Sequence, residues 1–301
     1  MKISVFICTY NRGKLISGTL KSIINNQTIK PDEIVVVNGG GENNCAKTLD
    51  YWKTKFDSLV VIETKNINLS VSRNIGLPHC TGEIIMQTDD DARPFPNWIE
   101  QMVEFHKKFK TVGVIGGTVV DGSRSSFLSQ VADASTFPRY QEIQFVRSVP
   151  GVNSSYKKEV IQKVGKYDES LFRGEDVDYN WRVKLCGWDV LYVPTIKVEH
   201  IHRSNWYDLI KQHFMYGRAH YLVRSKWPEM YSHYPIKISS IKLLLKWFAS
   251  WLLIPLIDAK LKAKRFNQMI NGFDILTLLF VNLSNRIGSS YQKIKAQLNL
   301  V

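Results

Sequence analysis

Short apolar runs alternate with amphipathic helical patterns along the N-terminal part of the chain, and this alternation constrains the fold more than any other feature. The pattern predicts strands over residues 3–9, 33–37, 59–64 and 83–87, and helices over residues 15–25, 45–56 and about 68–77. Strands and helices in strict alternation indicate βαβ units, whose strands pair in parallel. We therefore expect an α/β fold with a mostly parallel central sheet, which binds ligands outside the carboxyl ends of its strands.

Three polar clusters stand at the predicted carboxyl ends of these strands. They are residues 9–12 (Thr-Tyr-Asn-Arg), 38–41 (Asn-Gly-Gly-Gly) and the triple aspartate 89–91. Because adjacent carboxylates repel one another, the triple aspartate indicates a divalent cation or a metal-bound polyphosphate. A solvated turn ahead of Pro94 is the alternative interpretation. The glycine run lacks the Lys-Ser/Thr of a P-loop, and no GxGxxG follows the first strand, so we expect phosphate to be held through a metal.

The length of 301 residues accommodates one large α/β domain with an appendage, or two domains. The four cysteines are scattered, without CxxC pairs, which favours a reducing compartment. Only Lys2 precedes the first apolar run, a start that resembles a buried strand more than a signal peptide. These features predict a cytoplasmic location.

The C-terminal third differs from the rest in charge and in apolar texture. Residues 201–301 contain 15 Lys/Arg against 4 Asp/Glu, whereas residues 1–200 contain 25 against 23. The apolar runs 243–257 and 275–281 are too short to span a bilayer. Apolar helices beside Lys and Arg favour attachment to an anionic membrane surface. The alternatives are a helical subdomain packed on the core or on a second subunit, so that an oligomer remains open, and, on weaker grounds, a nucleic-acid groove.

A set of short motifs in a fixed order resembles one known family. The motifs occupy residues 4–12, 31–37, 72–76, 81–91, 151–153, 164–169, 174–178, 182, 187–188 and 193–200. In this order they resemble a family 2 glycosyltransferase with the GT-A fold, over roughly residues 1–205. The resemblance implies a GT-A catalytic domain over residues 1–205. The composition of residues 206–301 predicts a basic, apolar helical C-terminal region, for which membrane association is the favoured interpretation.

The resemblance also implies a site for a nucleoside-diphosphate sugar and a divalent metal, Mn²⁺ or Mg²⁺. Asp89, Asp90 and Asp91 would form the DxD motif that holds the sugar nucleotide, with Asp91 as the direct metal ligand. His200 stands where some members place a further metal ligand, and a structural strand-end histidine is the alternative. Imidazole is more compatible with Mn²⁺ than with Mg²⁺.

Further donor contacts follow from the same resemblance. Thr9 and Tyr10 would contact the base and ribose, and Arg73 would face the nucleotide unless it serves as an ion-pair partner. Asn38 stands where the family usually has an aspartate that receives the imide N–H of the base. An amide can still pair with uracil, so UDP is favoured, with GDP and dTDP as alternatives.

The Glu175-Asp176 pair opens a predicted helix over residues 177–186. The resemblance implies that Asp176 is the general base that takes a proton from an acceptor hydroxyl, so that a single displacement inverts the anomeric carbon. Glu175 and Asn153 would contact the acceptor or the donor sugar. Without the resemblance, both acidic residues would be interpreted as complements of the helix dipole.

The acceptor implied by the basic tail is a glycan or a lipid-linked molecule at the cytoplasmic face of a membrane, and not a nucleic acid. Two rival functions remain. A sugar nucleotidyltransferase would need a basic Gly-rich loop after the first strand, where Thr9 to Arg12 stand instead. A non-enzymatic membrane or nucleic-acid binding protein would not need the carboxylates.

Overall fold

A computed structural model describes the chain except for residues 41–42, 123–125, 203–204, 231–239, 266–271 and 299–301. The chain divides into two compact units. The first contains Met1–Gly122 and Pro138–Ile201, and the second contains Ser123–Phe137 and His202–Val301. The expected boundary at residue 205 thus differs from the observed one, both in position and because a segment from the middle of the chain belongs to the second unit.

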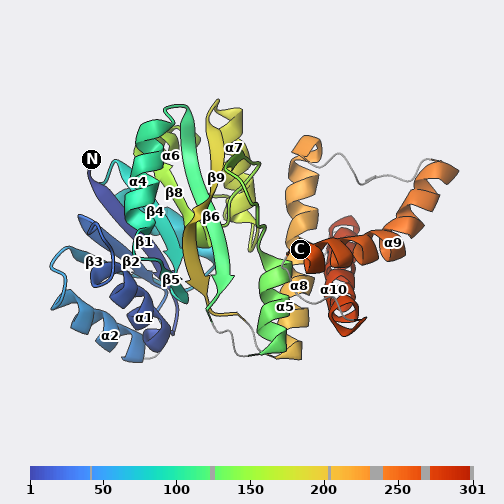
Figure 1. Ribbon diagram of the computed structural model, residues 1–301, viewed down its shortest axis with the longest axis horizontal. Coiled ribbons are helices and arrows are strands. Elements are labelled where there is room, and N and C mark those ends of the chain that lie inside the picture. The colour runs from blue at the N-terminus through green and yellow to red at the C-terminus, as the bar shows by residue number, and fades with distance from the viewer. Residues whose placement is uncertain (41–42, 123–125, 203–204, 231–239, 266–271, 299–301) are drawn as a thin grey trace. The chain divides into compact units, whose positions relative to one another are not determined.

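The first unit is built on a nine-stranded sheet with the order β3-β2-β1-β4-β8-β6-β9-β5, and β7 pairs with β9 outside this path (Figure 1). The strands are β1 Ile3–Thr9, β2 Glu33–Asn38, β3 Leu59–Glu63, β4 Ile84–Asp89, β5 Ala92–Pro94, β6 Val112–Asp121, β7 Gln144–Phe145, β8 Ser154–Lys157 and β9 Asp189–His200. The four predicted strands pair in parallel, which confirms the sequence-based expectation.

The remaining strands make the sheet mixed. β8 is antiparallel to both β4 and β6, whereas β6 and β9 are parallel. β5 is antiparallel to β9, and this pairing brings the end of β9 beside the residues that follow β4. Two distant segments of the sequence therefore meet at one edge of the sheet.

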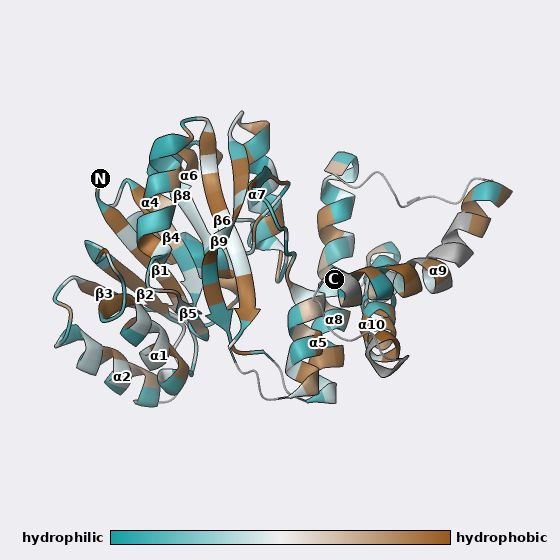
Figure 2. Cartoon of the chain, in the orientation of Figure 1, coloured by the Kyte–Doolittle hydropathy of each residue, from teal (hydrophilic) through white to brown (hydrophobic). Residues whose placement is uncertain are grey.

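Helices cover the sheet and enclose its apolar core. They are α1 Gly13–Ile24, α2 Asn43–Lys53, α3 Leu69–Gly76, α4 Trp98–Lys108, α6 Lys158–Val164 and α7 Glu175–Leu185. The first three match the predicted helices to within a few residues. Phe6, Val37, Ile85 and Tyr156 from the strands pack with Tyr179 of α7 in one buried cluster. Figure 2 shows hydrophobic residues along the central strands and a mixture of hydrophilic and hydrophobic residues in the flanking helices.

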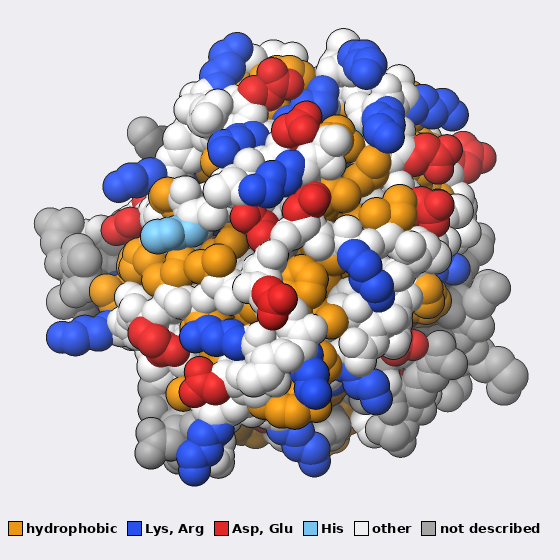
Figure 3. All heavy atoms as spheres, turned by 90° about the vertical axis from the view of Figure 1, so that its left-hand side faces the viewer, with side chains coloured by type: hydrophobic (Ala, Val, Ile, Leu, Met, Phe, Trp, Pro, Cys, Tyr) orange, Lys and Arg blue, Asp and Glu red, His pale blue; other side chains and the backbone are white. Residues whose placement is uncertain are grey.

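The surface of this unit carries charges of both signs. Figure 3 shows basic and acidic side chains interspersed on the face that it presents. This mixture agrees with the near balance of 25 Lys/Arg and 23 Asp/Glu in residues 1–200. The excess positive charge of the chain therefore belongs to the second unit.

The second unit consists of helices. They are α5 Phe127–Thr136, α8 Trp206–Lys226, α9 Ile241–Arg265 and α10 Gly272–Gln297. Val131 of α5 packs with Leu209 of α8, Ala259 of α9 and Leu278 of α10 in a second apolar cluster. The short helix α5 has few large apolar residues and depends on the other helices for its burial. Within the described part of the chain, none of the helices combines the length and apolar character that crossing a bilayer requires.

Two glycines allow α8 and α10 to pack closely. A Cβ added at Gly217 would lie 1.7 Å from the carbonyl oxygen of Asn285, and one at Gly288 would lie 2.0 Å from the carbonyl oxygen of Phe214. These contacts are with backbone atoms, so a larger side chain cannot be relieved by a rotamer change.

We predict that Gly217→Ala and Gly288→Ala each destabilise the helical unit by about 1–3 kcal/mol, the cost of overpacking a close interface. In an exposed helix the same substitution would stabilise by roughly 1 kcal/mol through helix propensity. Urea or thermal unfolding of the purified variants measures the difference. Unchanged or increased stability would contradict the observed close approach of the two helices.

Candidate active site

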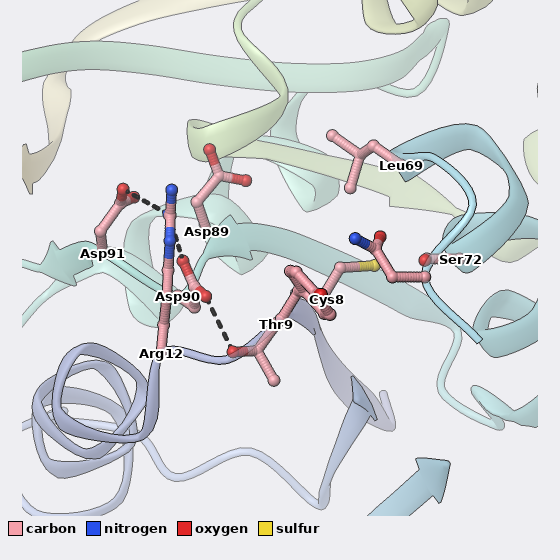
Figure 4. A pocket seen from close by; sticks show the side chains of 10 residues that line it. Cys8, Thr9, Arg12, Leu69, Ser72, Asp89, Asp90 and Asp91 are labelled. Atoms are coloured by element: carbon pink, nitrogen blue, oxygen red, sulfur yellow. Dashed lines mark hydrogen bonds and ion pairs between the residues drawn. The ribbon is translucent and has the colours of Figure 1, made fainter. Parts of the chain in front are cut away.

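The carboxyl ends of the parallel strands converge as the sequence predicts. Thr9 at the end of β1 pairs with Asn38 at the end of β2, and Cys8 pairs with Asp89 at the end of β4. A pocket of about 260 Å³ opens at this edge, lined by Cys8, Thr9, Tyr10, Arg12, Asn66, Leu69, Ser72, Asp89, Asp90 and Asp91 (Figure 4). The N-terminal turn and the triple aspartate therefore share one pocket.

Asp90 is the buried centre of the triple aspartate. Its carboxylate accepts hydrogen bonds from Thr9 Oγ1 at 2.8 Å and from Arg12 Nη1 at 3.0 Å (Figure 4). Asn11 adopts a left-handed backbone conformation, with φ of 55°, in the turn between β1 and α1. Asp90 and Thr9, both predicted to contact the nucleotide, line the pocket and are hydrogen-bonded to each other. Arg12 was not singled out, although it directly follows Thr9-Tyr10-Asn11.

Asp89, Asp91 and His200 form a candidate metal centre. Each offers one ligand atom, and these atoms all lie within 4.8 Å of one another. His200 Nε2 lies 3.2 Å from Asp91 Oδ1. Adjacent ligands of an octahedral ion at roughly 2.1 Å are about 3 Å apart, so this separation suits two neighbouring ligands of one ion. Two carboxylates and one imidazole form a donor set that favours Mn²⁺ over Mg²⁺.

Strand pairing positions His200. It is the last residue of β9 and pairs with Ala92 of β5, and the backbone N–H of Ile201 donates to the carbonyl of Asp91 at 3.1 Å. The sequence alone left open whether His200 is a ligand or a structural residue. Its proximity to Asp91 supports the ligand role. The neighbouring His202 belongs to the second unit, where its Nε2 lies 3.3 Å from Asp133 Oδ1.

The electrostatics of the centre reflect the crowding of its carboxylates. Burial, reinforced by the charge of Asp91, raises the pKa of Asp89 to about 7. Burial opposes ionisation of Asp91 as well, but its hydrogen bond with His200 and the charges of His200 and Arg12 hold its pKa below the usual value. Burial works against the charged form of His200, yet Asp91 and Asp89 raise its pKa. A cation in the centre would stabilise the ionised form of Asp89.

Arg73, Glu175 and Asp176 lie together near the candidate metal centre. Arg73 is buried, and its Nη1 lies 2.6 Å from Glu175 Oε1. Its charge lowers the pKa of both Glu175 and Asp89, against the larger effect of burial, so the two groups of carboxylates lie within electrostatic range of one cation. Arg73 therefore pairs with a carboxylate, the alternative that sequence analysis gave for this residue.

Asp176 is fixed by the backbone at the start of α7. Its Oδ2 accepts from the N–H of Gly151 at 3.0 Å, and its Oδ1 accepts from the N–H of Val177 at 2.8 Å. A Cβ at position 151 would lie 2.6 Å from Arg73 Nη2, so glycine allows this close approach. Asp176 is half-buried, whereas Glu175 is buried in its ion pair. Of the two, Asp176 has the carboxylate that a ligand can reach more easily.

Asn38 is oriented by a residue that sequence analysis did not consider. Its Nδ2 donates to both carboxylate oxygens of Glu63, at 3.1 and 2.9 Å, across the paired ends of β2 and β3. Tyr10 is half-exposed and lines the pocket nearby, and a Cβ on Gly39 would lie 3.3 Å from the Tyr10 ring. Glu63 stands at the end of the third predicted strand, so its position at the sheet edge was available as a signal.

Asn153 has a structural position and does not line the pocket. Its side chain is completely buried, accepts from Trp98 Nε1 at 2.9 Å, and donates to the carbonyls of Thr118 at 3.0 Å and Ile196 at 3.1 Å. Sequence analysis expected an acceptor or donor-sugar contact here. The structure instead assigns the amide to joining α4, β6 and β9, because these buried polar groups need partners.

Comparison with known families gives a match over more than half of the chain. Residues 4–165 match the sequence model of the family described as "Glycosyl transferase family 2". The chain is 32% identical over 187 residues to a glucosyl-dolichyl phosphate glucuronosyltransferase of Haloferax volcanii, an alignment that covers 58% of this chain and 59% of that protein. It is 24% identical over 307 residues to a poly-beta-1,6-N-acetyl-D-glucosamine synthase of Staphylococcus epidermidis, covering 93% of this chain and 72% of that protein.

Solved structures share the fold. A mannosyltransferase of Pyrobaculum calidifontis, in complex with GDP-Man and Mn²⁺, has a TM-score of 0.67 at 16% identity, covering 99% of this chain and 87% of that one. A structure described as GalNAc-T7 with UDP, GalNAc and Mn²⁺ has a TM-score of 0.57 at 17% identity, covering 89% of this chain and 58% of that one. At these identities the likeness establishes the GT-A fold.

We predict that Asn153→Ala destabilises the first unit by about 3 kcal/mol or more, since it leaves the buried Trp98 N–H and two carbonyls without their partner. Urea unfolding measures this loss. Asn66→Ala is the control, because Asn66 is an exposed asparagine that lines the pocket. If Asn153→Ala unfolded like the control, the structural assignment would be contradicted.

Proposed function

Because the chain belongs to glycosyl transferase family 2, we propose that it transfers a sugar from a nucleoside-diphosphate sugar to a hydroxyl of a glycan or lipid-linked acceptor, with inversion at the anomeric carbon. The observation that carries this proposal is the juxtaposition of Asp89, Asp91 and His200 beside the pocket at the carboxyl ends of the strands. Such a centre can hold the donor on one side while a base approaches from the other.

The donor would bind through its diphosphate and its base. Asp89, Asp91 and His200 would hold Mn²⁺, which in its bound state offsets the charge on the departing diphosphate. Similar folds that bind GDP-Man or UDP together with Mn²⁺ support this assignment. Tyr10 and Thr9 line the pocket where base and ribose would lie.

Asn38 would recognise the edge of the base. Because a carboxylate only accepts hydrogen bonds, Glu63 fixes the amide with Nδ2 towards itself. This orientation leaves Asn38 Oδ1 without a hydrogen-bond partner among the described residues. An acceptor at this position suits the ring N–H of uracil, thymine or guanine, in keeping with UDP as the favoured donor nucleotide and GDP or dTDP as alternatives.

Asp176 would act as the general base. Its carboxylate takes the proton of the acceptor hydroxyl while that oxygen attacks the anomeric carbon and the bond to the diphosphate oxygen breaks. Hydrogen bonds from Gly151 and Val177 hold the carboxylate in place during this step. Glu175 is engaged by Arg73, so we assign it the role of fixing Arg73 near the donor site.

The acceptor side would be presented at the cytoplasmic face of a membrane by the helical unit. The exposed apolar side chains on α9 include Leu253, Ile257 and Leu261, which follow one another at intervals of one helical turn beside the exposed Lys260. On α10 the exposed apolar side chains are Leu276, Phe280, Ile287, Tyr291 and Ile294. Apolar faces on a strongly basic segment suit an anionic leaflet. A relative whose name includes a dolichyl phosphate supports a lipid-linked acceptor.

We predict that Asp91→Ala and Asp176→Asn each reduce sugar transfer by roughly 100-fold or more, the usual contribution of such groups. Only Asp91→Ala should weaken metal-dependent nucleotide binding, because Asp176 contacts the acceptor. Calorimetric titration with UDP in Mn²⁺, beside a transfer assay, measures both. Glu159→Gln removes an exposed carboxylate on α6 and is the control. Equal loss of nucleotide binding in both variants would refute this division of roles.

We predict that the full chain co-sediments with vesicles containing phosphatidylglycerol and that Ile287→Glu combined with Ile294→Glu reduces this binding at least several-fold. The two side chains are 52% and 56% exposed, so the substitutions should not disturb the fold. Ile67→Glu is the control, because Ile67 is 68% exposed in the first unit. Equal binding by the double variant would show that α10 does not contact the leaflet.

A further inference from the structure

Arg12 forms an ion pair with Asp91, a carboxylate that the candidate metal centre also needs. Its Nη1 lies 3.0 Å from Asp91 Oδ2 and 3.0 Å from Asp90 Oδ1 (Figure 4). On the other side of Asp91, Oδ1 lies 3.2 Å from His200 Nε2. Asp91 therefore stands between the Arg12 cation and the place where a metal would lie.

Arg12 is the part of this arrangement that is best able to move. Its side chain is 39% exposed, whereas the side chains of Asp90 and Asp91 are 6% and 15% exposed. The Arg12 backbone is fixed, since its carbonyl accepts from the N–H groups of Leu15 and Ile16 at the start of α1. The guanidinium can therefore change partners within the pocket while the main chain remains in place.

The Arg12 guanidinium and a divalent ion would compete for the negative charge of Asp91. A divalent ion beside Asp91 would be repelled by the guanidinium on the same carboxylate and would have to share its negative charge. A diphosphate in the pocket would give the guanidinium another partner, because its planar set of donors matches phosphate oxygens in two-pronged hydrogen bonds. Arg12 lines the pocket that such a diphosphate would enter.

We propose that Arg12 occupies Asp91 as an internal cation in the ligand-free protein and moves to the diphosphate when the donor binds, which makes metal and nucleotide bind cooperatively. This inference rests on the proposed function. Each ligand alone is repelled by part of the cluster. The guanidinium repels the metal, and the carboxylates repel the diphosphate. When both bind, Arg12 moves from Asp91 to the diphosphate, and Asp91 binds the metal. Linkage requires that each ligand raise the affinity for the other by the same factor.

The test is to measure Mn²⁺ affinity of the full chain by electron paramagnetic resonance, with and without UDP and, in parallel, GDP. We expect the nucleotide that binds to raise Mn²⁺ affinity of the wild-type chain by roughly tenfold or more. Arg12→Gln should bind Mn²⁺ alone several-fold more tightly than the wild type, and nucleotide should then raise its Mn²⁺ affinity by a smaller factor, because only the direct attraction between metal and diphosphate remains. A merely structural role for Arg12 would weaken both ligands instead.

Two further variants make the outcome decisive. Lys14→Gln removes one positive charge from an exposed position two residues away and should behave like the wild type. Arg12→Lys retains the charge without the two-pronged geometry, so it should still oppose Mn²⁺ alone but show weaker coupling. The inference is overturned if Arg12→Gln binds Mn²⁺ alone no more tightly than Lys14→Gln, or if its coupling to nucleotide equals that of the wild type. Absence of Mn²⁺ and nucleotide binding in every chain, wild type included, would overturn the proposed function itself.

Discussion

Repulsion among three carboxylates at the end of β4 is the constraint on which the site depends. Two of them have partners elsewhere in the first unit: Asp90 accepts hydrogen bonds from Thr9 and Arg12, and Asp91 pairs with Arg12 and His200. Asp89 is half-buried, its carboxylate makes no hydrogen bond with the residues that the structure describes, and its pKa is raised to about 7. The arrangement therefore holds a negative charge that the protein offsets incompletely, which is the electrostatic condition for binding a divalent cation.

Paired charges also surround Asp176, the proposed general base. Arg73 is the buried cation between the end of β4 and the start of α7, and its ion pair with Glu175 leaves Asp176 to the backbone N–H groups of Gly151 and Val177. Two adjacent acidic residues thus acquire different surroundings from their different partners. These contacts are the basis for the proposed roles, Glu175 as a positioning residue and Asp176 as a base.

Apolar and polar patterns along the sequence predicted the parts of the fold that depend on residues close together in the chain. Alternating apolar runs gave the parallel strands β1 to β4, and the polar residues that follow them meet at one edge as expected. The antiparallel strand β8 and the helix α5 were not predicted, because their burial depends on distant partners. Position along the chain suggested a ligand role for Asn153, but the interior around Trp98 decides its role. The pairs Arg12–Asp91 and Asn38–Glu63 likewise join segments whose proximity only the folded sheet reveals.

The central claim is that the triple aspartate and His200 bind a nucleotide-sugar through a divalent metal. Thermal unfolding of the full chain with UDP-, GDP- and dTDP-sugars, each with and without Mn²⁺, tests it most directly. A ligand at a hundred times its dissociation constant stabilises the folded protein by about 2.7 kcal/mol. The account predicts that at least one nucleotide class raises the unfolding temperature only when Mn²⁺ is present, and that a chelator removes the effect. An unchanged unfolding temperature across all three classes, with and without Mn²⁺, would contradict the account.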